Sequence, residues 1–412
     1  MSKLAILGGA PMLAELPAYT RWPVPGNDAA EALNAVLESG VWGTLGPANA
    51  AFAAQYAAYC GTRFALPVLN GTVSLELILK ALGVGYGDEV IAPPYTFTAT
   101  IHAIVSVGAT PVFADIDPGS YTLCPISCEQ MITPRTRAII AVHLGGRPAD
   151  WDALSEVAGR HGLPLIEDSA HGAGSEFRRR RTGSLGVAGS FSFQASKNLS
   201  SGEGGAITTN DEALYHRLWS LHHNGRAFGD GGYDHPVLGT DARLSEWQCA
   251  MLLAGMKRLD ADNERRMRSA AILDRALGRL PFIEPMRPDD RITRNGIHMY
   301  VFKYKKEGLK GLPRSLFIKA LAAENVCQPA EGYCDPIYDM GFLRSAAYQK
   351  ATGSVFKDSS ARLPGNELAA REQGCWLYHA SLLGDDEDIY RIVEAAERVA
   401  GQADELMRAG RS

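Results

Sequence analysis

The sequence predicts an α/β protein with a mostly parallel central sheet between helices and a smaller C-terminal α+β domain. From about residue 60 to 210, short apolar segments of strand type alternate with segments of helical periodicity. Such alternation is typical of a parallel sheet covered by helices on both faces. The length of 412 residues fits a large domain with a smaller partner, and 46% hydrophobic with 21% charged residues is ordinary for a globular chain.

The expected elements begin with a helix over residues 28–39, which Gly40 ends. Buried strands are expected at 89–92, 111–114, 138–142, 164–166, 189–193 and 206–209. The helices between them are expected at 73–82, 98–107 and 151–161. Right-handed crossovers place the loops after such strands on one rim of the sheet, where ligands usually bind.

The C-terminal half begins with helical patterns at 212–222 and 245–275, and the second is long and rich in charge. We expect it to connect two domains. Beyond it, a strand is expected at 298–304 and helices at 313–324 and 385–407. The predicted division is an N-terminal arm and large domain over 1–260, then the connector and a small domain over 261–412.

Charge and composition argue against several classes of protein. The formal net charge is -5 and no basic stripe occurs, which disfavours a nucleic-acid partner. The run Arg178–Arg181 precedes Thr182 and Gly183 and predicts a solvated hairpin tip, with an anion site as the alternative. No apolar run approaches the roughly 20 residues of a membrane span, and the apolar stretch near Met1 is too short for a signal peptide.

The cysteines and the first glycines exclude two further kinds of site. The seven cysteines include no CxxC pair, and Cys124 and Cys128 have no second pair to complete a zinc site. We therefore expect reduced cysteines, no metal and a cytoplasmic protein. Gly8 and Gly9 follow an apolar stretch, but Pro11 comes at once and the rest of a dinucleotide motif is missing.

Four segments in the α/β region carry residues suited to chemistry. Gly71 and Thr72 open an expected helix, with Thr72 as its N-cap, and the free amides of the first turn could bind an anion. An ordinary capped helix is the alternative. Phe97 follows a buried strand and could lie against a planar ring, or could belong to the core.

The other two segments supply charge. Asp168 ends an otherwise apolar strand, where a carboxylate is costly unless a cation pairs with it. A protonated pyridine nitrogen, a metal ion or an arginine would be such a cation. Lys197 stands in the turn after a strand, between Phe193 and the glycine-rich run that begins at Gly202. A lysine near a ring and a phosphate suits imine chemistry, although an isolated loop lysine is usually a surface residue.

In this order the segments resemble the sugar aminotransferase family of pyridoxal 5'-phosphate (PLP) enzymes, the DegT/DnrJ/EryC1/StrS family. The motifs are NGT at 70–72, PYTF at 94–97, EDSAH at 167–171, SFQASK at 192–197 and GEGG at 202–205. Segments at 41–43 and 239–248 extend the likeness over nearly the whole chain, and 375–384 is similar to the cyclitol branch. That branch includes scyllo-inosose aminotransferases and 3-amino-5-hydroxybenzoate synthases. The resemblance implies the fold of PLP-dependent transferases, fold type I.

The resemblance also implies roles for single residues. Lys197 forms the imine with the cofactor and moves the proton between substrate and cofactor, and Asp168 pairs with the pyridine nitrogen. Phe97 and Ala170 lie on the two faces of the ring. The remaining cofactor contacts are the phosphate-binding residues Gly71, Thr72, Val73 and Ser192, and His171 and Gln194 at the ring's edge.

Two positions depart from the family. His171 stands where the family usually has glutamine, although some hydroxybenzoate synthases have histidine. Asp241 stands where the family has an asparagine that donates to the phosphate from the second subunit. Because an aspartate repels a phosphate, Asp241 either turns away, stays protonated or is offset by Arg243 or Arg226.

The implied activity is transfer of an amino group from glutamine or glutamate to a keto-cyclitol or keto-sugar, with ping-pong kinetics through an internal aldimine and pyridoxamine phosphate. An aromatising 3-amino-5-hydroxybenzoate synthase and a non-catalytic PLP-binding regulatory protein are the alternatives. The family closes its sites between two subunits, so we expect a homodimer. Candidate substrate contacts are Trp42, Tyr95, Tyr333 and His379.

Overall fold

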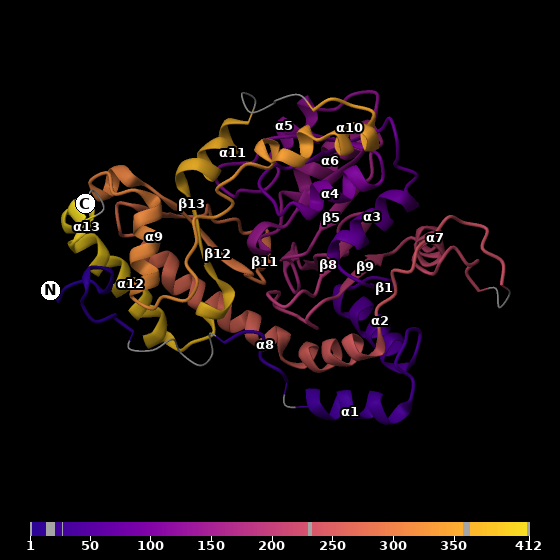
Figure 1. Ribbon diagram of the computed structural model, residues 1–412, viewed down its shortest axis with the longest axis horizontal. Helices are drawn as coiled ribbons and strands as arrows, with labels where there is room; N and C mark the ends of the chain where they lie inside the picture. The colour runs from indigo at the N-terminus through magenta and orange to yellow at the C-terminus, as the bar shows by residue number, and fades with distance from the viewer. Residues whose placement is uncertain (1, 14–20, 27, 230–232, 357–362, 410–412) are drawn as a thin grey trace.

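The computed structural model describes residues 2–13, 21–26, 28–229, 233–356 and 363–409. Figure 1 shows a large lobe around a central sheet and a smaller lobe that carries the C-terminal helices and the first residues of the chain. The α/β fold class expected from the sequence is confirmed. The division at residue 260 stays a prediction.

The sheet of the large lobe has seven strands in the order β1-β9-β8-β5-β4-β2-β3. Five neighbouring strands are parallel, and β9 runs antiparallel to both β8 and β1. The strands are β1 (Phe64–Val68), β2 (Glu89–Ala92), β3 (Thr110–Phe113), β4 (Thr136–Val142), β5 (Leu165–Asp168), β8 (Ala188–Ser192) and β9 (Gly205–Thr209). The six expected strands are confirmed. The seventh, β1, contains Pro67 and lies at the edge, where a proline is tolerated.

Helices bury both faces of this sheet. One face is covered by α3 (Gly71–Ala81), α4 (Ala99–Ser106) and α7 (Glu212–His222), whose apolar side chains share one core with the strands. The other face is covered by α5 (Pro125–Gln130), α6 (Trp151–His161) and α2 (Pro47–Cys60). Helices α10 (Ala346–Thr352) and α11 (Pro364–Leu368) come from later in the chain, and α10 packs against α4. The helices expected from the sequence in this lobe are confirmed.

The long helix α8 (Glu246–Leu277) runs under both lobes (Figure 1). Its 32 residues correspond to about 48 Å. Ser245 and Gln248 form a capping box at its start, and α1 (Ala29–Ser39) packs along its first half. Leu252 belongs to the core of the large lobe and Leu273 to that of the small lobe, so one helix holds both.

The small lobe has an antiparallel sheet of β10 (Ile283–Pro285), β12 (Met299–Tyr304) and β13 (Gly374–Tyr378), packed on α9 (Arg314–Ala323) and α12 (Asp386–Gly401). The strand and the first helix expected here are confirmed. The expected final helix is interrupted at Gln402, whose φ of -121° leaves the helical region, and resumes as α13 (Ala403–Ala409). Leu4 is fully buried in this lobe.

The arginine run forms a hairpin, as expected. It joins β6 (Glu176–Phe177) to β7 (Arg180–Arg181), and β11 (Ile292–Arg294) pairs with β6. Arg178 and Arg179 have φ of 48° and 62° at its tip. Arg181 instead turns back to Asp260 at 3.1 Å, so the run is not uniformly solvated.

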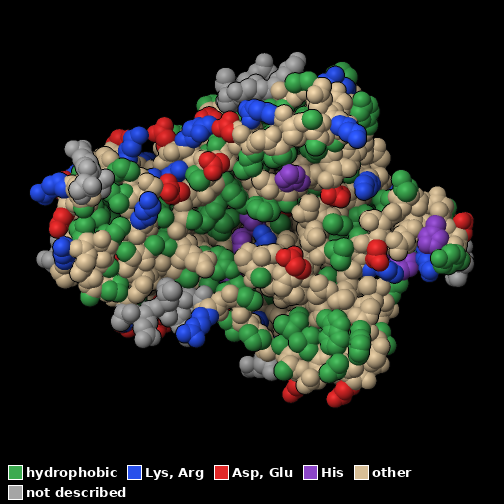
Figure 2. All heavy atoms as spheres, viewed as in Figure 1, with side chains coloured by type: hydrophobic (Ala, Val, Ile, Leu, Met, Phe, Trp, Pro, Cys, Tyr) green, Lys and Arg blue, Asp and Glu red, His purple; other side chains and the backbone are tan. Residues whose placement is uncertain are grey.

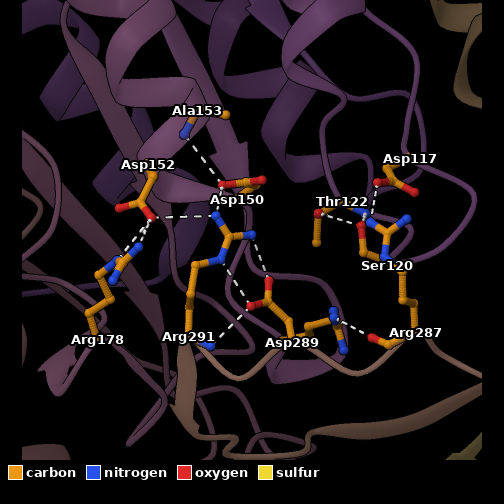
Figure 3. Close-up of polar contacts among 11 residues, drawn as sticks. Asp117, Ser120, Thr122, Asp150, Asp152, Ala153, Arg178, Arg287, Asp289 and Arg291 are labelled. Carbon is orange, nitrogen blue, oxygen red and sulfur yellow. Dashed lines mark hydrogen bonds and ion pairs between the residues drawn. The ribbon is translucent and has the colours of Figure 1, made fainter.

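Ion pairs join the segment after β10 to the large lobe (Figure 3). Arg291 lies 2.7 Å from Asp150 and 2.8 Å from Asp289, and Arg287 lies 2.6 Å from Asp117. These side chains are partly exposed, so each pair contributes little alone. Together they fix how the small lobe's loop sits beside α6.

Within the described residues, no helix is long and apolar enough to cross a membrane. All seven cysteines lie within the described residues, where no disulfide joins them, and most are buried. Over that same part of the chain, histidines, cysteines and acids form no cluster that could hold a metal ion.

Candidate active site

Lys197 lies in a tight turn after β8 that several segments hold. The amide of Lys197 donates to the carbonyl of Gln194 at 2.8 Å, and the carbonyl of Lys197 accepts from the indole of Trp22 at 3.1 Å. The carbonyl of Ser196 accepts from the hydroxyl of Tyr378 at 2.9 Å. Figure 2 shows a hollow between the lobes, with histidine and cationic side chains at its floor. The turn is therefore fixed from both lobes.

Burial lowers the pKa of Lys197 from 10.5 to about 8, and the charge of Asp168 opposes this shift. We expect the ligand-free protein to capture an aldehyde cofactor faster as pH rises through about 8, since only the neutral amine attacks. Stopped-flow absorbance measures this rate. Asp168→Asn should move the midpoint to lower pH, because it removes the carboxylate that favours the ammonium. A midpoint near 10.5 in the unmodified protein would contradict a desolvated lysine.

Asp168 ends β5 and is 5% exposed. Its carboxylate accepts from the hydroxyl of Thr100 at 2.8 Å and from the amide of Ala170 at 3.2 Å. Burial raises its pKa. Neutral donors alone leave a buried carboxylate costly, so this position suits a cation that a ligand brings.

The start of α3 forms an anion cradle beside β8. Asn70 is the N-cap, since its side chain accepts from the amide of Val73 at 2.9 Å. The prediction of Thr72 as N-cap is wrong by two residues: both residue types cap helices, and Gly71 already has helical geometry. Among the described residues, nothing accepts from the amides of Gly71 and Thr72. A Cβ at Gly71 would lie 3.0 Å from that of Ser192, so glycine permits this approach.

The side chains expected around the ring differ in exposure. Phe97 is 61% exposed in the segment between β2 and α4, unlike a core residue, and Ala170 is half-buried after β5. His171 is buried, and its Nδ1 accepts from the amide of Gly145 at 3.3 Å. A neutral imidazole that accepts at Nδ1 carries its hydrogen on Nε2. His171 therefore presents a donor, as a glutamine amide would.

The remaining expected contacts separate into supporting and outlying residues. Gln194 accepts from the amide of Ser196 at 2.8 Å and so shapes the turn. His379 is fully buried, and its Nε2 lies 3.0 Å from the Ser196 carbonyl. Tyr95 is 1% exposed, which leaves it no surface for a substrate in this conformation. Its ring centroid lies 5.5 Å from that of Tyr333, and burial, followed by the charge of Asp168, raises the pKa of Tyr333.

Trp42 lies apart from this group. It is 51% exposed and packs at 5.9 Å from Trp247 at the start of α8. Its indole donates to the carbonyl of Leu37 at 3.2 Å. Contact between Trp42 and a substrate stays a prediction.

Asp241 is paired within its own chain. Its two carboxylate oxygens accept from Arg243 at 2.7 and 2.6 Å, and this pairing lowers its pKa. Of the three possibilities for Asp241, the structure supports the offset by Arg243 and speaks against protonation. A neutral pair of this kind removes most of the repulsion toward a phosphate.

Several residues of the site were not expected from the sequence. Thr100 holds Asp168, Trp22 covers the lysine turn, and Asn198 and His298 bond to each other at 3.2 Å beneath it. Asn198 and His298 are 100 residues apart in sequence. The sequence offered only weak signals for them: Asn198 is a polar residue next to Lys197, and His298 is a polar residue at the start of an expected strand.

Comparison with solved structures places this fold in a known class. The structure of 3-amino-5-hydroxybenzoic acid synthase superposes with a TM-score of 0.85 at 32% identity, covering 95% of this chain and 100% of that one. The PLP form of a protein from Streptococcus pneumoniae described as a sugar aminotransferase gives 0.80 at 26%, covering 92% and 98%. The chain has the PLP-dependent transferase fold of type I.

The chain belongs to the DegT/DnrJ/EryC1/StrS aminotransferase family, whose match spans residues 24–396. It is 37% identical over 429 residues to the L-glutamine:2-deoxy-scyllo-inosose aminotransferase of Micromonospora echinospora. The match covers 98% of this chain and 100% of that protein. The protein is therefore an aminotransferase, as the sequence predicted.

The residues present fit the cofactor of this family. Asp168 is a buried carboxylate whose hydrogen bonds come from neutral donors, with the charge of Lys197 acting on it from nearby, which suits a pyridinium nitrogen. Gly71 and Thr72 offer free amides at a helix N-terminus, which suits a phosphate. The exposed ring of Phe97 offers a stacking face. Pyridoxal phosphate has all three of these groups.

Proposed function

We propose that this protein transfers the amino group of L-glutamine to a keto-cyclitol of the scyllo-inosose type, using pyridoxal phosphate. The observation that carries the proposal is the desolvated Lys197 together with the buried Asp168, whose hydrogen bonds come from neutral donors. The likeness to glutamine:scyllo-inosose aminotransferases over the full chain supports the choice of donor and acceptor. The nearest alternatives are glutamate as the amino donor and a keto-sugar as the amino acceptor.

When bound, pyridoxal phosphate supplies an electrophilic carbon and an electron-withdrawing ring. The proposed work of the protein is to hold it and to move protons. Asp168 keeps the ring nitrogen protonated, and the amides of Gly71 and Thr72 bind the phosphate with help from Ser192. Nζ of Lys197 would take the proton from the donor's α-carbon and pass it to a carbon of the cofactor. The lowered pKa of Lys197 suits both steps near neutral pH.

The remaining roles follow the geometry. His171 donates from Nε2 to the ring's oxygen, and Gln194 holds the turn that carries Lys197. Phe97 and Ala170 enclose the ring. Val73 stabilises the cradle through Asn70, since its amide is already bonded. Trp42, Tyr333 and Asp241 remain proposed contacts with substrate or phosphate, and cytoplasmic action is part of the proposal.

The test is a coupled assay of purified protein with 2-deoxy-scyllo-inosose and L-glutamine. We expect an aminocyclitol product and parallel double-reciprocal plots, as ping-pong kinetics require. Replacing glutamine by glutamate, and the inosose by a nucleotide-linked keto-sugar, ranks the alternatives. Absence of amination for every cyclitol ketone would refute the proposed acceptor class.

An aromatising synthase is the second candidate, because the solved synthase shares the fold at a TM-score of 0.85. The same assay with an aminodehydroshikimate-type substrate separates the two. Formation of an aromatic product would favour the synthase. The greater identity to the inosose aminotransferase, 37% against 32%, favours amination.

We also propose a homodimer with shared sites. The segment between α7 and α8 projects from the large lobe (Figure 1) and carries Tyr233 and Leu238, which are 84% and 97% exposed. Leu37 and Leu45 are 55% and 49% exposed near α1. Exposed apolar side chains that gather on one surface, unlike isolated ones, are typical of subunit contacts.

We expect Leu238→Asp to raise the dimer dissociation constant about tenfold or more, since a charge replaces an apolar contact. Sedimentation velocity over a dilution series measures it. Ile126→Asp is the matched control: Ile126 is 72% exposed on α5 and should leave assembly unchanged. Equal effects of both substitutions, or a monomeric wild type, would contradict the proposed interface.

A further inference from the structure

Three buried histidines lie side by side at the floor of the site. His298 precedes β12 and is 5% exposed. Its ring stacks on His171 with centroids 4.4 Å apart and lies 5.4 Å from His379. Burial, together with the charge of Lys197, lowers the pKa of all three histidines, so the rings are neutral. The hydrogen-bonding role of each ring then depends on which nitrogen carries the hydrogen.

A chain of hydrogen bonds fixes that choice for His298. Arg266 is fully buried and can only donate, and it donates to Oδ1 of Asn263 at 2.9 Å. The amide nitrogen of Asn263 donates to the carbonyl of Ala173 at 3.0 Å, so its orientation is set. The amide nitrogen of Asn198 donates to the same Oδ1 at 3.3 Å and to the Gly296 carbonyl.

Oδ1 of Asn198 is therefore the acceptor for Nδ1 of His298, at 3.2 Å. Nδ1 must carry the hydrogen, and Nε2 is left with a lone pair. Among the described residues, no donor reaches this Nε2. It is also not one of the polar atoms that are sealed from solvent, whereas Nδ1 of His379 is. Burial lowers the pKa of His298 most, followed by His171 and then the charge of Lys197, so His298 lies close to the lysine and this free acceptor belongs to the same site.

The two stacked rings present opposite groups. His171 offers a donor on Nε2, because its Nδ1 accepts from Gly145. His298 offers an acceptor on its Nε2, and the centroids of the two rings are 4.4 Å apart. The proposed cofactor needs only the donor, for its ring oxygen. The acceptor of His298 is left for the second substrate, and a hydroxyl is the donor group that a keto-cyclitol carries on most of its ring carbons.

We propose that Nε2 of His298 accepts a hydrogen bond from one hydroxyl of the acceptor ketone and so selects polyol substrates. This inference rests on the proposed function. A ketone without that hydroxyl leaves a desolvated acceptor unpaired, which reduces its transfer rate relative to the hydroxylated substrate. His298 is thus a specificity-determining residue, and Arg266, Asn263 and Asn198 are positioning residues that set its tautomer.

Two variants separate this role from packing. His298→Asn keeps a donor toward Asn198 but has no group at the ε position. His298→Gln places an amide oxygen near the position of Nε2. The ketone substrates to be compared are scyllo-inosose and a series of analogues that each lack one hydroxyl. For the wild type, we expect kcat/KM to fall about 10–100-fold for one member of the series.

His298→Asn should show that loss already with scyllo-inosose and no further loss with the critical analogue, whereas His298→Gln should keep most of the discrimination. A uniform loss over all acceptors would overturn the proposal and leave His298 as packing for His171. If the wild type aminates no cyclitol, the proposed function fails as well. Amination without a hydroxyl-specific effect of His298 overturns this inference alone.

A second measurement does not use catalysis. Histidine-selective ¹⁵N NMR of the ligand-free protein, assigned with His298→Gln, should show His298 as the neutral Nδ1–H tautomer between pH 6 and 8. Asn198→Asp retains an acceptor for Nδ1 and should keep that tautomer, while Asn198→Leu should release it. A wild-type signal from the Nε2–H form would overturn the proposal.

Discussion

Replacing Lys197 with alanine is expected to lower kcat by about 10⁴-fold or more. The amine is the proposed covalent anchor and proton carrier, and proton transfer by a positioned side chain alone contributes about 10²–10⁴-fold. The visible absorbance band of the bound cofactor should also shift, and borohydride should no longer fix the cofactor to the protein. The fold should remain, because the substitution shortens the side chain and leaves the backbone hydrogen bonds of residue 197 to Gln194 and Trp22 intact.

Lys257→Ala is the matched control, since Lys257 pairs with Asp28 on the exposed side of α8. It should retain normal kcat and the normal absorbance band. Added methylamine should restore part of the activity of Lys197→Ala if the missing group is an amine. An unchanged band in Lys197→Ala would show that another residue carries the cofactor.

The large lobe was predictable because buried parallel strands appear as short apolar runs. The six expected strands differ from the observed ones by a few residues at their ends. Helix α2 was not expected because its alanine-rich sequence gives a weak contrast between faces, although Phe52, Tyr56 and Cys60 are buried four residues apart. Strand β13 depends on pairing with β12, more than 70 residues earlier in the chain.

The proposed catalytic pair was visible in the sequence because Asp168 and Lys197 follow strands that end at the same rim. Their support was not visible. Thr100 reaches Asp168 from another crossover, and the tautomer of His298 depends on Arg266 through two asparagines. Such contacts are fixed by tertiary packing, and no local spacing encodes them.

The buried pair of Glu324 and Arg398 is expected to give the largest change in stability. Glu324 ends α9 and is fully buried. Its carboxylate accepts from Arg398 and from the amides of Ala5 at 2.9 Å and Met12 at 2.7 Å. Arg398 also donates to the carbonyl of Lys3 at 2.7 Å. The pair therefore attaches the N-terminal segment to the small lobe.

Glu324→Leu should reduce the free energy of unfolding by about 3–5 kcal/mol, because it strands the Arg398 cation and two backbone amides. Urea denaturation measures this. The double variant Glu324→Leu with Arg398→Met should recover part of the loss, since no charge stays buried, yet not all of it, since the amides of Ala5 and Met12 still lack an acceptor. Arg391→Ala removes an exposed pair with Glu387 and should change stability by less than about 0.5 kcal/mol. If Glu324→Leu cost no more than this surface variant, the N-terminal segment would be held by its apolar contacts, such as Leu4, and the buried charges would serve no stabilising role.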